Sequence, residues 1–457
     1  MTCVLPLRDE CDTWKLVPHQ TRIEMNAPSQ ESSNDTPAAT GTVRYTGALI
    51  TVTMLFFIWG FLTALNDILV PHLKPIFDLN YKQVILVQFT FFSAYFLFSI
   101  PSGMLIDRVG YKRAMVTGLA IMSFGAAMFV PAAKAPSFPL FLAALLALGA
   151  GITLLQVAAN PYVTVLGPAK TASSRLNLTQ AFNSLGTTIA PYFGSMLILS
   201  AVAKPAAELH AMSPDAFQAY RLQQAASVIL PYIGLSLTLL VLAVIIAAAR
   251  LPGIPQAVRS HTSHESDTSV WKRRHLVLGA VAIFAYVGAE VAIGSFLVNY
   301  FGVPAIGGLA PDRAARLVSL YWFGAMVGRF IGAWVLRYVR TGIVLAFNAV
   351  AACALVLFSV MSSGHLAIGS ILLVGLFNSI MFPSIFALGV AELGPLTGDG
   401  SGVLNMAIVG GAVIPLLAGA LADKIGIQHA FVLPAFCYLY ILYYALRGSR
   451  PTVVARA

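Results

Sequence analysis

The feature that most constrains this chain is a series of long apolar segments, which begins after Tyr45 and runs almost to the end. Each segment is long enough to cross the hydrocarbon core of a bilayer, which takes about 20 residues of helix. Backbone groups in lipid must be hydrogen-bonded within the protein, and these segments are too long for barrel strands. We therefore predict an all-α membrane protein with twelve transmembrane helices, at residues 46–72, 83–106, 113–133, 138–166, 175–201, 225–250, 274–301, 314–338, 341–362, 366–391, 398–422 and 428–447.

Charge is scarce, and its placement fits this prediction. Only 10% of the residues are charged, whereas about 25% is typical of soluble domains, so the surface must face lipid. The net charge of +10 comes from short basic clusters between the apolar segments, such as Trp271-Lys272-Arg273-Arg274. Such loop clusters set membrane orientation, which disfavours nucleic acid as a partner. The excess of Lys and Arg falls in the loops that are cytoplasmic when both termini are cytoplasmic.

The polar stretches divide the chain into parts. The first 45 residues contain no apolar core of a signal peptide and are expected to form a disordered cytoplasmic tail, with Met25 as a candidate start. The longest polar interruption within the membrane region separates the helices six and six. The predicted organisation is a tail at 1–45, a six-helix half at 46–250, a cytoplasmic linker at 251–273, a second half at 274–447 and a cytoplasmic tail at 448–457.

The two halves also resemble each other. Gly60 and Gly288 are 228 residues apart, Arg108 and Arg337 are 229 apart, and the Gly-x4-Pro patterns starting at Gly186 and Gly410 are 224 apart. A near-constant offset indicates two pseudo-symmetric six-helix halves. Parallel repeats of this kind place a substrate site near the middle of the membrane, between the halves.

Two acidic residues are predicted inside the membrane. Asp67 is flanked by apolar residues in the first segment, and Glu290 lies in the early half of the seventh. Ionisable groups are costly there and mark functional sites, and a carboxyl group in an apolar setting is harder to ionise. Such a group can bind a proton in one state and release it in another, although either residue could instead serve only packing. Arg329, near the end of its segment, is expected to snorkel to the inner interface.

Uncharged polar residues form stripes on several helices. Gln156 and Asn160 are one turn apart, and Asn177, Gln180, Asn183 and Thr187 recur at steps of three or four. Asn378 and Asn405 lie in later segments, and Trp59, Tyr95, Tyr286 and Trp322 are candidates to stack on a sugar ring. Amides that supply both donors and acceptors suit a neutral polyhydroxylated ligand, although they also join helices to one another. We find no hydrolase, metalloprotease or nucleotide-binding motif, and predict no catalytic residues, no metal site and no cofactor.

The sequence Gly103-Met104-Leu105-Ile106-Asp107-Arg108-Val109-Gly110-Tyr111-Lys112-Arg113 resembles the signature of the major facilitator superfamily. The resemblance implies a cytoplasmic gate motif formed by Gly103, Asp107, Arg108, Gly110, Lys112 and Arg113. Further stretches are similar to the fucose–galactose–glucose/proton symporter family, and most of all to its glucose/galactose branch: Asn66-Asp67, Val87-Gln88-Phe89, Ala158-Ala159-Asn160-Pro161-Tyr162, Tyr286-Val287-Gly288-Ala289-Glu290 and Phe382-Pro383-Ser384-Ile385-Phe386-Ala387-Leu388-Gly389.

This resemblance implies sugar uptake with protons across a bacterial inner membrane, with Asp67 as the coupling carboxylate. One departure is important, because Gln156 stands where the fucose symporter pattern has a second acid, and glutamine cannot release a proton. Conversely, Glu290 stands where that pattern has an amide, which suggests that the second acid lies in the second half of this chain. The candidate substrate-binding residues are Asn66, Gln88, Gln156, Asn160, Gln180, Asn183, Glu290 and Asn378, and the candidate proton-coupling residues are Asp67 and Glu290.

The predicted function is import of a neutral hexose, glucose or galactose before fucose, by a monomer in the lipid bilayer that alternates access between its two sides. Three rival transporters remain open: a sugar uniporter, a sodium-coupled sugar symporter and a drug exporter, although amide stripes disfavour the apolar cavity of an exporter. A membrane sugar sensor is the alternative outside transport, and the chain carries no recognisable signalling domain.

Overall fold

The structure is a computed structural model that describes residues 45–77, 81–134, 137–198, 212–252 and 269–451. Some side chains inside the helices also lie outside the description, at 65–77, 81–85, 88, 194–198, 221 and 224–228. The predicted N-terminal tail, most of the linker and the end of the C-terminal tail lie outside the described residues. The side chains of Asn66, Asp67 and Gln88 also do.

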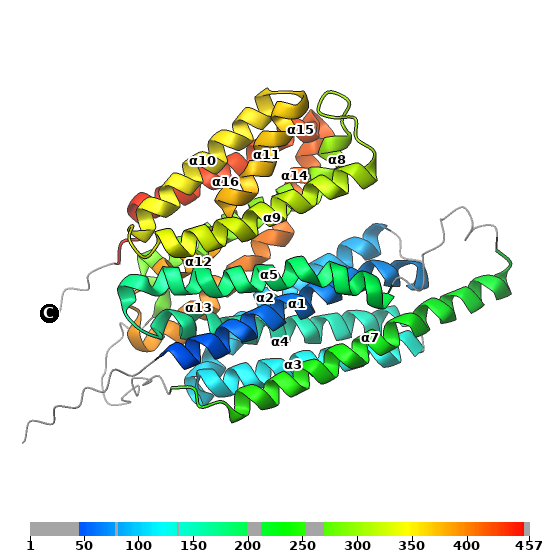
Figure 1. Ribbon diagram of the computed structural model, residues 1–457, viewed down its shortest axis with the longest axis horizontal. Helices are drawn as coiled ribbons and strands as arrows, with labels where there is room; N and C mark the ends of the chain where they lie inside the picture. Colours follow the sequence, from blue (N-terminus) through cyan, green and yellow to red (C-terminus); the bar gives the residue numbers. More distant parts are fainter. Residues whose placement is uncertain (1–44, 78–80, 135–136, 199–211, 253–268, 452–457) are drawn as a thin grey trace, which may run out of the picture. The chain divides into compact units, whose positions relative to one another are not determined.

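The described residues form helices, at the places where the apolar segments predict them (Figure 1). The first half contains α1 (Thr46–Phe77), α2 (Tyr81–Val109), α3 (Tyr111–Lys134), α4 (Phe138–Val165), α5 (Ala172–Ile198) and α7 (Pro214–Ala248). The second half contains α8 (Arg274–Gly302), α9 (Pro311–Val335), α10 (Thr341–Met361), α11 (Gly364–Asn378), α12 (Met381–Gly389), α13 (Thr397–Met406), α14 (Gly410–Ile425), α15 (Ile427–Ala430) and α16 (Val432–Tyr443).

Eleven helical segments of the described chain are long and apolar enough to cross a membrane. The further long helix, α5, has 27 residues and carries the predicted polar stripe along one face. Together they confirm the predicted twelve-helix architecture. Large apolar side chains such as Phe124 and Met361 remain exposed on the outside of the bundle, as they do where a helix faces lipid.

Three predicted helices are interrupted, which corrects their expected continuity. The tenth is divided into α11 and α12 at Ser379 and Ile380, the eleventh is divided into α13 and α14 by a 3-10 turn at Ala407–Val409, and the twelfth starts with the short α15 and ends in a π-helical turn at Tyr444–Gly448. The first break has a local cause. Pro383 has no N–H group, so the carbonyl of Ser379 four residues earlier receives no helical hydrogen bond from it.

The glycines of the predicted repeat occupy equivalent helix crossings. In the first half, a Cβ atom on Gly186 of α5 would collide with the carbonyl of Phe57 in α1. In the second half, a Cβ atom on Gly410 of α14 would collide with the carbonyl of Phe284 in α8. The backbones of α1 and α5, and of α8 and α14, therefore cross at close range through glycine in both halves, as membrane helices often do.

The two halves contact each other at the end that carries the Gly103–Arg113 motif. Ser174 at the start of α5 donates to the carbonyl of Ala333 near the end of α9, at 2.5 Å. Ser401 of α13 donates to the carbonyl of Val157 in α4, at 2.8 Å. Pro161 leaves this Val157 carbonyl without its usual helical donor, so the proline supplies the acceptor for a bond between the halves.

The glycine crossings can be tested by substitution. We expect Gly186→Val and Gly410→Val each to lower the stability of the folded protein by about 1–3 kcal/mol or more, because the added side chain meets backbone that cannot move aside. Thermal unfolding in detergent, followed by size-exclusion chromatography, measures the change. Gly234→Val is the matched control, since a Cβ atom there meets nothing within 4 Å. Equal stability of all three variants would contradict the close crossing.

Candidate functional site

A cavity of about 220 Å³ lies where helices of the two halves meet. Eleven of its lining positions are not among the predicted proton-coupling or substrate-binding residues, and the helices that line it include α1, α2, α4, α5, α8 and α9. The cavity is lined by Trp59, Gly60, Thr63, Tyr95, Ile152, Gln156, Gln180, Asn183, Thr187, Tyr286, Val287, Glu290, Arg329, Phe382 and Ile408. Phe382 lies just after the α11–α12 break and Ile408 lies within the turn between α13 and α14, so the interrupted helices form part of the wall. Discontinuous helices frame the substrate sites of many secondary transporters.

The first half supplies a wall of amides. Gln156 Nε2 donates to the hydroxyl of Tyr95 at 2.9 Å, and Asn183 Nδ2 donates to the carbonyl of Phe56 at 2.9 Å. Gln180 Nε2 donates to Asn160 Oδ1 at 3.2 Å. An amide offers two donor hydrogens and two acceptor lone pairs. One bond to a neighbour therefore orients each side chain and leaves further capacity for a ligand.

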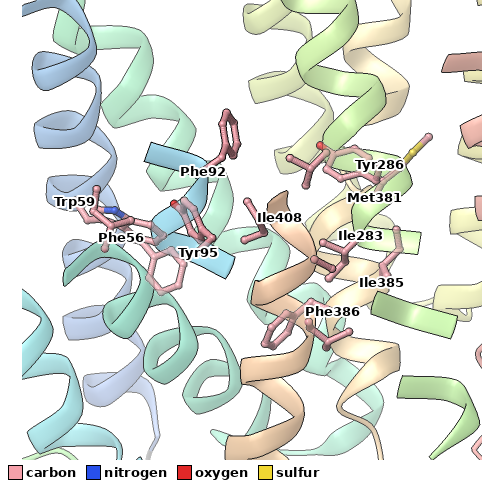
Figure 2. Packing of buried hydrophobic residues seen from close by; sticks show 14 of the residues in the cluster. Phe56, Trp59, Phe92, Tyr95, Ile283, Tyr286, Met381, Ile385, Phe386 and Ile408 are labelled. Carbon is pink, nitrogen blue, oxygen red and sulfur yellow. The ribbon is translucent and has the colours of Figure 1, made fainter. Parts of the chain in front are cut away.

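Aromatic side chains stand on both sides of the cavity. Figure 2 shows Trp59 and Tyr95 on one side and Tyr286 on the other, with Ile408 between them. Trp59 is only 5% exposed, and its Nε1 has no hydrogen-bond partner among the described residues. A buried donor without a partner is costly, so this N–H group is available to a ligand. Trp322, the fourth predicted stacking residue, is 44% exposed and does not line the cavity.

The second half supplies the charge. Glu290 is half-buried, and the Tyr286 hydroxyl, one turn earlier on α8, donates to its Oε1 at 2.7 Å. Arg329 of α9 interacts electrostatically with Glu290. The cavity wall therefore contains one carboxyl group and one guanidinium group, both from the second half.

The expected position of Arg329 was wrong. Arg329 does not extend to the membrane surface but lines the cavity, where its Nε donates to the carbonyl of Ser379 at 3.1 Å. Its Nη1 also donates to the hydroxyl of Ser184 in α5. The neighbouring Gly328 and Gly332 indicate why, because side chains there would collide with Ser379 and Ile380. This face of α9 packs against the α11–α12 break, and the Arg329 side chain is directed toward that break.

The structure separates the predicted substrate-binding residues into three groups. Gln156, Gln180, Asn183 and Glu290 line the cavity, and Thr187 of the polar stripe lies beside them. Asn160 and Asn378 are fully buried and do not line it, since Asn160 accepts from Gln180 and Asn378 Nδ2 donates to the Tyr321 hydroxyl at 2.8 Å. Asn66, Asp67 and Gln88 belong to α1 and α2, but their side chains lie outside the description.

The residues of the predicted cytoplasmic gate motif lie at the contact between the halves. Gly110 has a φ of 83°, a conformation that favours glycine, and it separates α2 from α3. A Cβ atom on Gly103 would lie 2.9 Å from the Gly398 carbonyl, and one on Gly398 would lie 2.6 Å from Asp107 Oδ1. The carboxylate of Asp107 thus lies at the start of α13, where the helix dipole favours negative charge. Arg108, Lys112 and Arg113 follow at the same end, with Arg108 and Arg113 exposed.

A metal site is not indicated in the described part of the chain, where no three His, Cys, Asp or Glu residues are grouped to hold an ion. Two halves of long apolar helices around a cavity that carries polar groups, with contacts between the halves at one end, are typical of a membrane transporter. The chain belongs to the Major Facilitator Superfamily, whose model matches residues 48–413.

Similar proteins show which members of the superfamily this chain resembles. A glucose/galactose transporter of Brucella abortus is 52% identical over 406 residues, which cover 89% of this chain and 95% of that protein. The L-fucose-proton symporter of Escherichia coli is 37% identical over 397 residues, covering 86% and 90%. A crystal structure of the transporter FucP in the outward conformation superposes with a TM-score of 0.84 at 36% identity, covering 89% of this chain and all of that one.

The cavity wall can be tested with cysteines. Gln156→Cys should react at least about tenfold faster than Asn160→Cys with a polar methanethiosulfonate reagent, because thiol reactivity follows exposure. Both belong in a background with Cys3 and Cys11 changed to serine, where the remaining Cys353 and Cys437 are buried. Mass spectrometry of the purified protein gives the rates. Equal rates at the two positions would show that the cavity wall is wrongly assigned.

Proposed function

We propose that this protein imports a neutral hexose together with protons by alternating access. The observation that carries the proposal is the cavity between the halves, in which amide groups of the first half face Glu290 of the second. Polar groups of this kind provide many donors and acceptors and little net charge, as a polyhydroxylated ligand requires. We further propose that the protein acts by moving this solute rather than by changing it chemically.

The size and lining of the cavity support a monosaccharide. Its volume of about 220 Å³ is below the roughly 300–1,000 Å³ typical of sites for drug-sized ligands. Gln156, Gln180 and Asn183 are proposed to bind hydroxyl groups from one side, and Glu290 from the other. The unpaired Nε1 of Trp59 is proposed as an additional donor, and its ring and that of Tyr286 as apolar surfaces for the sugar.

The similar proteins support the choice of substrate. The Brucella relative is described as a glucose/galactose transporter and the Escherichia coli relative as an L-fucose-proton symporter. The higher identity to the former favours glucose or galactose over fucose. The latter supports proton coupling, which we propose for this chain in preference to sodium coupling or uniport.

Proton coupling is proposed to use Asp67 and Glu290. Asp67 lies in α1 and is the acid that the family resemblance assigns to this role. Gln156 lines the cavity at the position where the fucose symporter pattern has its second acid, and it cannot titrate. Glu290 lines the same cavity from the opposite half and is proposed as the second acid.

The proposed cycle follows from these placements. A proton and a hexose bind on the outer side, the halves rock about the cavity, and both are released inside. Only a difference in affinity between the two states can drive the change.

We also propose a monomer in a bacterial inner membrane with both termini cytoplasmic, and with domain boundaries at 1–45, 46–250, 251–273, 274–447 and 448–457. Asn66, Gln88, Asn160 and Asn378 remain predicted sugar-binding residues, and Asn160 is bonded to the cavity residue Gln180.

A measurement of external pH tests the coupling. In lightly buffered, non-energised cells that express the protein, we expect glucose or galactose to make the medium alkaline because protons enter with the sugar. Asp67→Asn should abolish this signal while leaving the protein in the membrane. Entry of labelled sugar without any pH change would retain the sugar assignment but contradict proton symport.

The orphaned indole gives a second test. Trp59→Phe retains an aromatic ring but removes the N–H donor, so we expect the dissociation constant of the sugar to rise by about fivefold to tenfold, the equivalent of one neutral hydrogen bond. Isothermal titration calorimetry on purified protein measures it. Trp322→Phe, outside the cavity, is the matched control. An unchanged affinity in Trp59→Phe would remove this residue from the site.

A further inference from the structure

Arg329 makes contacts that the proposed function does not use. Its Nε donates to the carbonyl of Ser379 in its own half, and its Nη1 donates to the hydroxyl of Ser184 in the other half. It also faces the carboxyl group of Glu290 across the cavity. One guanidinium group therefore bonds to a helix break and to the opposite half, and it lines the same cavity as an ionisable acid.

The Ser379 contact explains why the cation can remain at this depth. Pro383 leaves the Ser379 carbonyl without a helical donor, and the guanidinium supplies one. This bond fixes the base of the side chain and leaves the outer nitrogens free to choose partners. A guanidinium has five N–H donors in a rigid planar fork, which suits it to bridge several acceptors.

The outer nitrogens have two competing partners. Ionised Glu290 attracts Arg329 strongly, because charges interact more strongly in a poorly polarisable interior than in water. Protonated Glu290 carries no charge, and the guanidinium then bonds more firmly to Ser184 of the other half. Protonation of Glu290 thereby changes the strength of the Arg329–Ser184 bond between the halves.

We propose that Arg329 is a positioning residue that transmits the protonation state of Glu290 to the contact between the two halves through Ser184. The proposal rests on the proposed function, since it concerns proton-coupled sugar transport. It assigns the second coupling acid of this chain, beside Asp67, to a charged pair in the second half, in place of the acid that α4 lacks at Gln156. When Glu290 takes up a proton from water on one side and returns it to water on the other, the Arg329–Ser184 bond strengthens and weakens in step.

The groups that face Glu290 in the described structure are few. Tyr286 comes from its own helix, Arg329 and Tyr321 from α9, and Tyr438 from α16. Tyr286 donates to the carboxyl group, and the Tyr321 hydroxyl accepts from Asn378. Among these groups only Arg329 is a cation, and Arg329 also reaches the other half.

The proposal predicts opposite changes in two variants. Because ligand linkage is reciprocal, the Ser184 bond favours protonated Glu290, and removing it favours the ionised form. Ser184→Ala should therefore move the midpoint of the pH profile of transport to lower pH, by about half a unit or more. Arg329→Gln removes the charge that stabilises the ionised acid, so it should move the midpoint to higher pH by about one unit.

The experiment is sugar counterflow in proteoliposomes with equal pH on both sides, measured for each purified variant over a range of pH. Ser401→Ala is the matched control. It also removes a hydroxyl that joins the halves, at 2.8 Å to the Val157 carbonyl, but it has no charged partner there. It should change the rate without moving the midpoint. Arg329→Lys, which keeps the charge, covers the case in which Arg329→Gln does not fold, and its midpoint should stay closer to that of the unmodified protein.

The outcomes separate this inference from the proposed function. The shift caused by Ser184→Ala should vanish in a Glu290→Gln background, because the acid it acts on is gone. Counterflow that falls equally at every pH in Ser184→Ala and Arg329→Gln would overturn the inference and leave hexose transport standing. A folded, unmodified protein that exchanges no hexose at any pH would instead overturn the proposed function.

Discussion

The structure depends on one constraint, which is that a backbone group released from a helix inside the membrane must find a partner within the protein. Pro161 and Pro383 each remove one donor, and the carbonyls of Val157 and Ser379 are released. Ser401 from the opposite half donates to the first, and Arg329 donates to the second. The prolines thus create acceptors where the halves and the cavity meet, and one of their partners, Arg329, is the residue proposed to transmit the protonation state of Glu290.

The two halves share a helix plan but differ in chemistry. Equivalent glycine crossings at Gly186 and Gly410 set the spacing of helices in both. The cavity wall of the first half carries the amides of Gln156, Gln180 and Asn183, whereas that of the second half carries Glu290 and Arg329. Close backbone packing fixes where side chains emerge, so a change of residue type at one position alters the chemistry without altering the fold. Gln156 and Glu290 are an example, since the fucose symporter pattern has an acid at the position of Gln156 and an amide at the position of Glu290.

Much of the fold could be predicted from the sequence, because the bilayer imposes a length and an apolar composition on each helix. The helix breaks could not, since hydropathy does not distinguish a continuous helix from one interrupted at Ser379 or at Ala407–Val409. Helical spacing correctly placed Gln180 and Asn183 in the cavity wall. It could not separate Gln156 from Asn160, which share a face, because the neighbouring Gln180 determines that Asn160 is covered.

Arg329 shows the limit of arguing from one helix alone. It lies six residues before the end of α9, or about 9 Å at 1.5 Å per residue, which is within reach of the surface for a long side chain. The deciding partners are the Ser379 carbonyl and the Ser184 hydroxyl, and both come from other helices. The sequence did contain a signal for this position. Arg329 lies on a glycine-lined face of α9, and the preceding helix α8 carries an acid, Glu290, without a predicted basic partner. Because an unpaired charge at that depth is costly, an acid and a base on adjacent helices of one half are better explained as a pair that faces the cavity than as two separate surface groups.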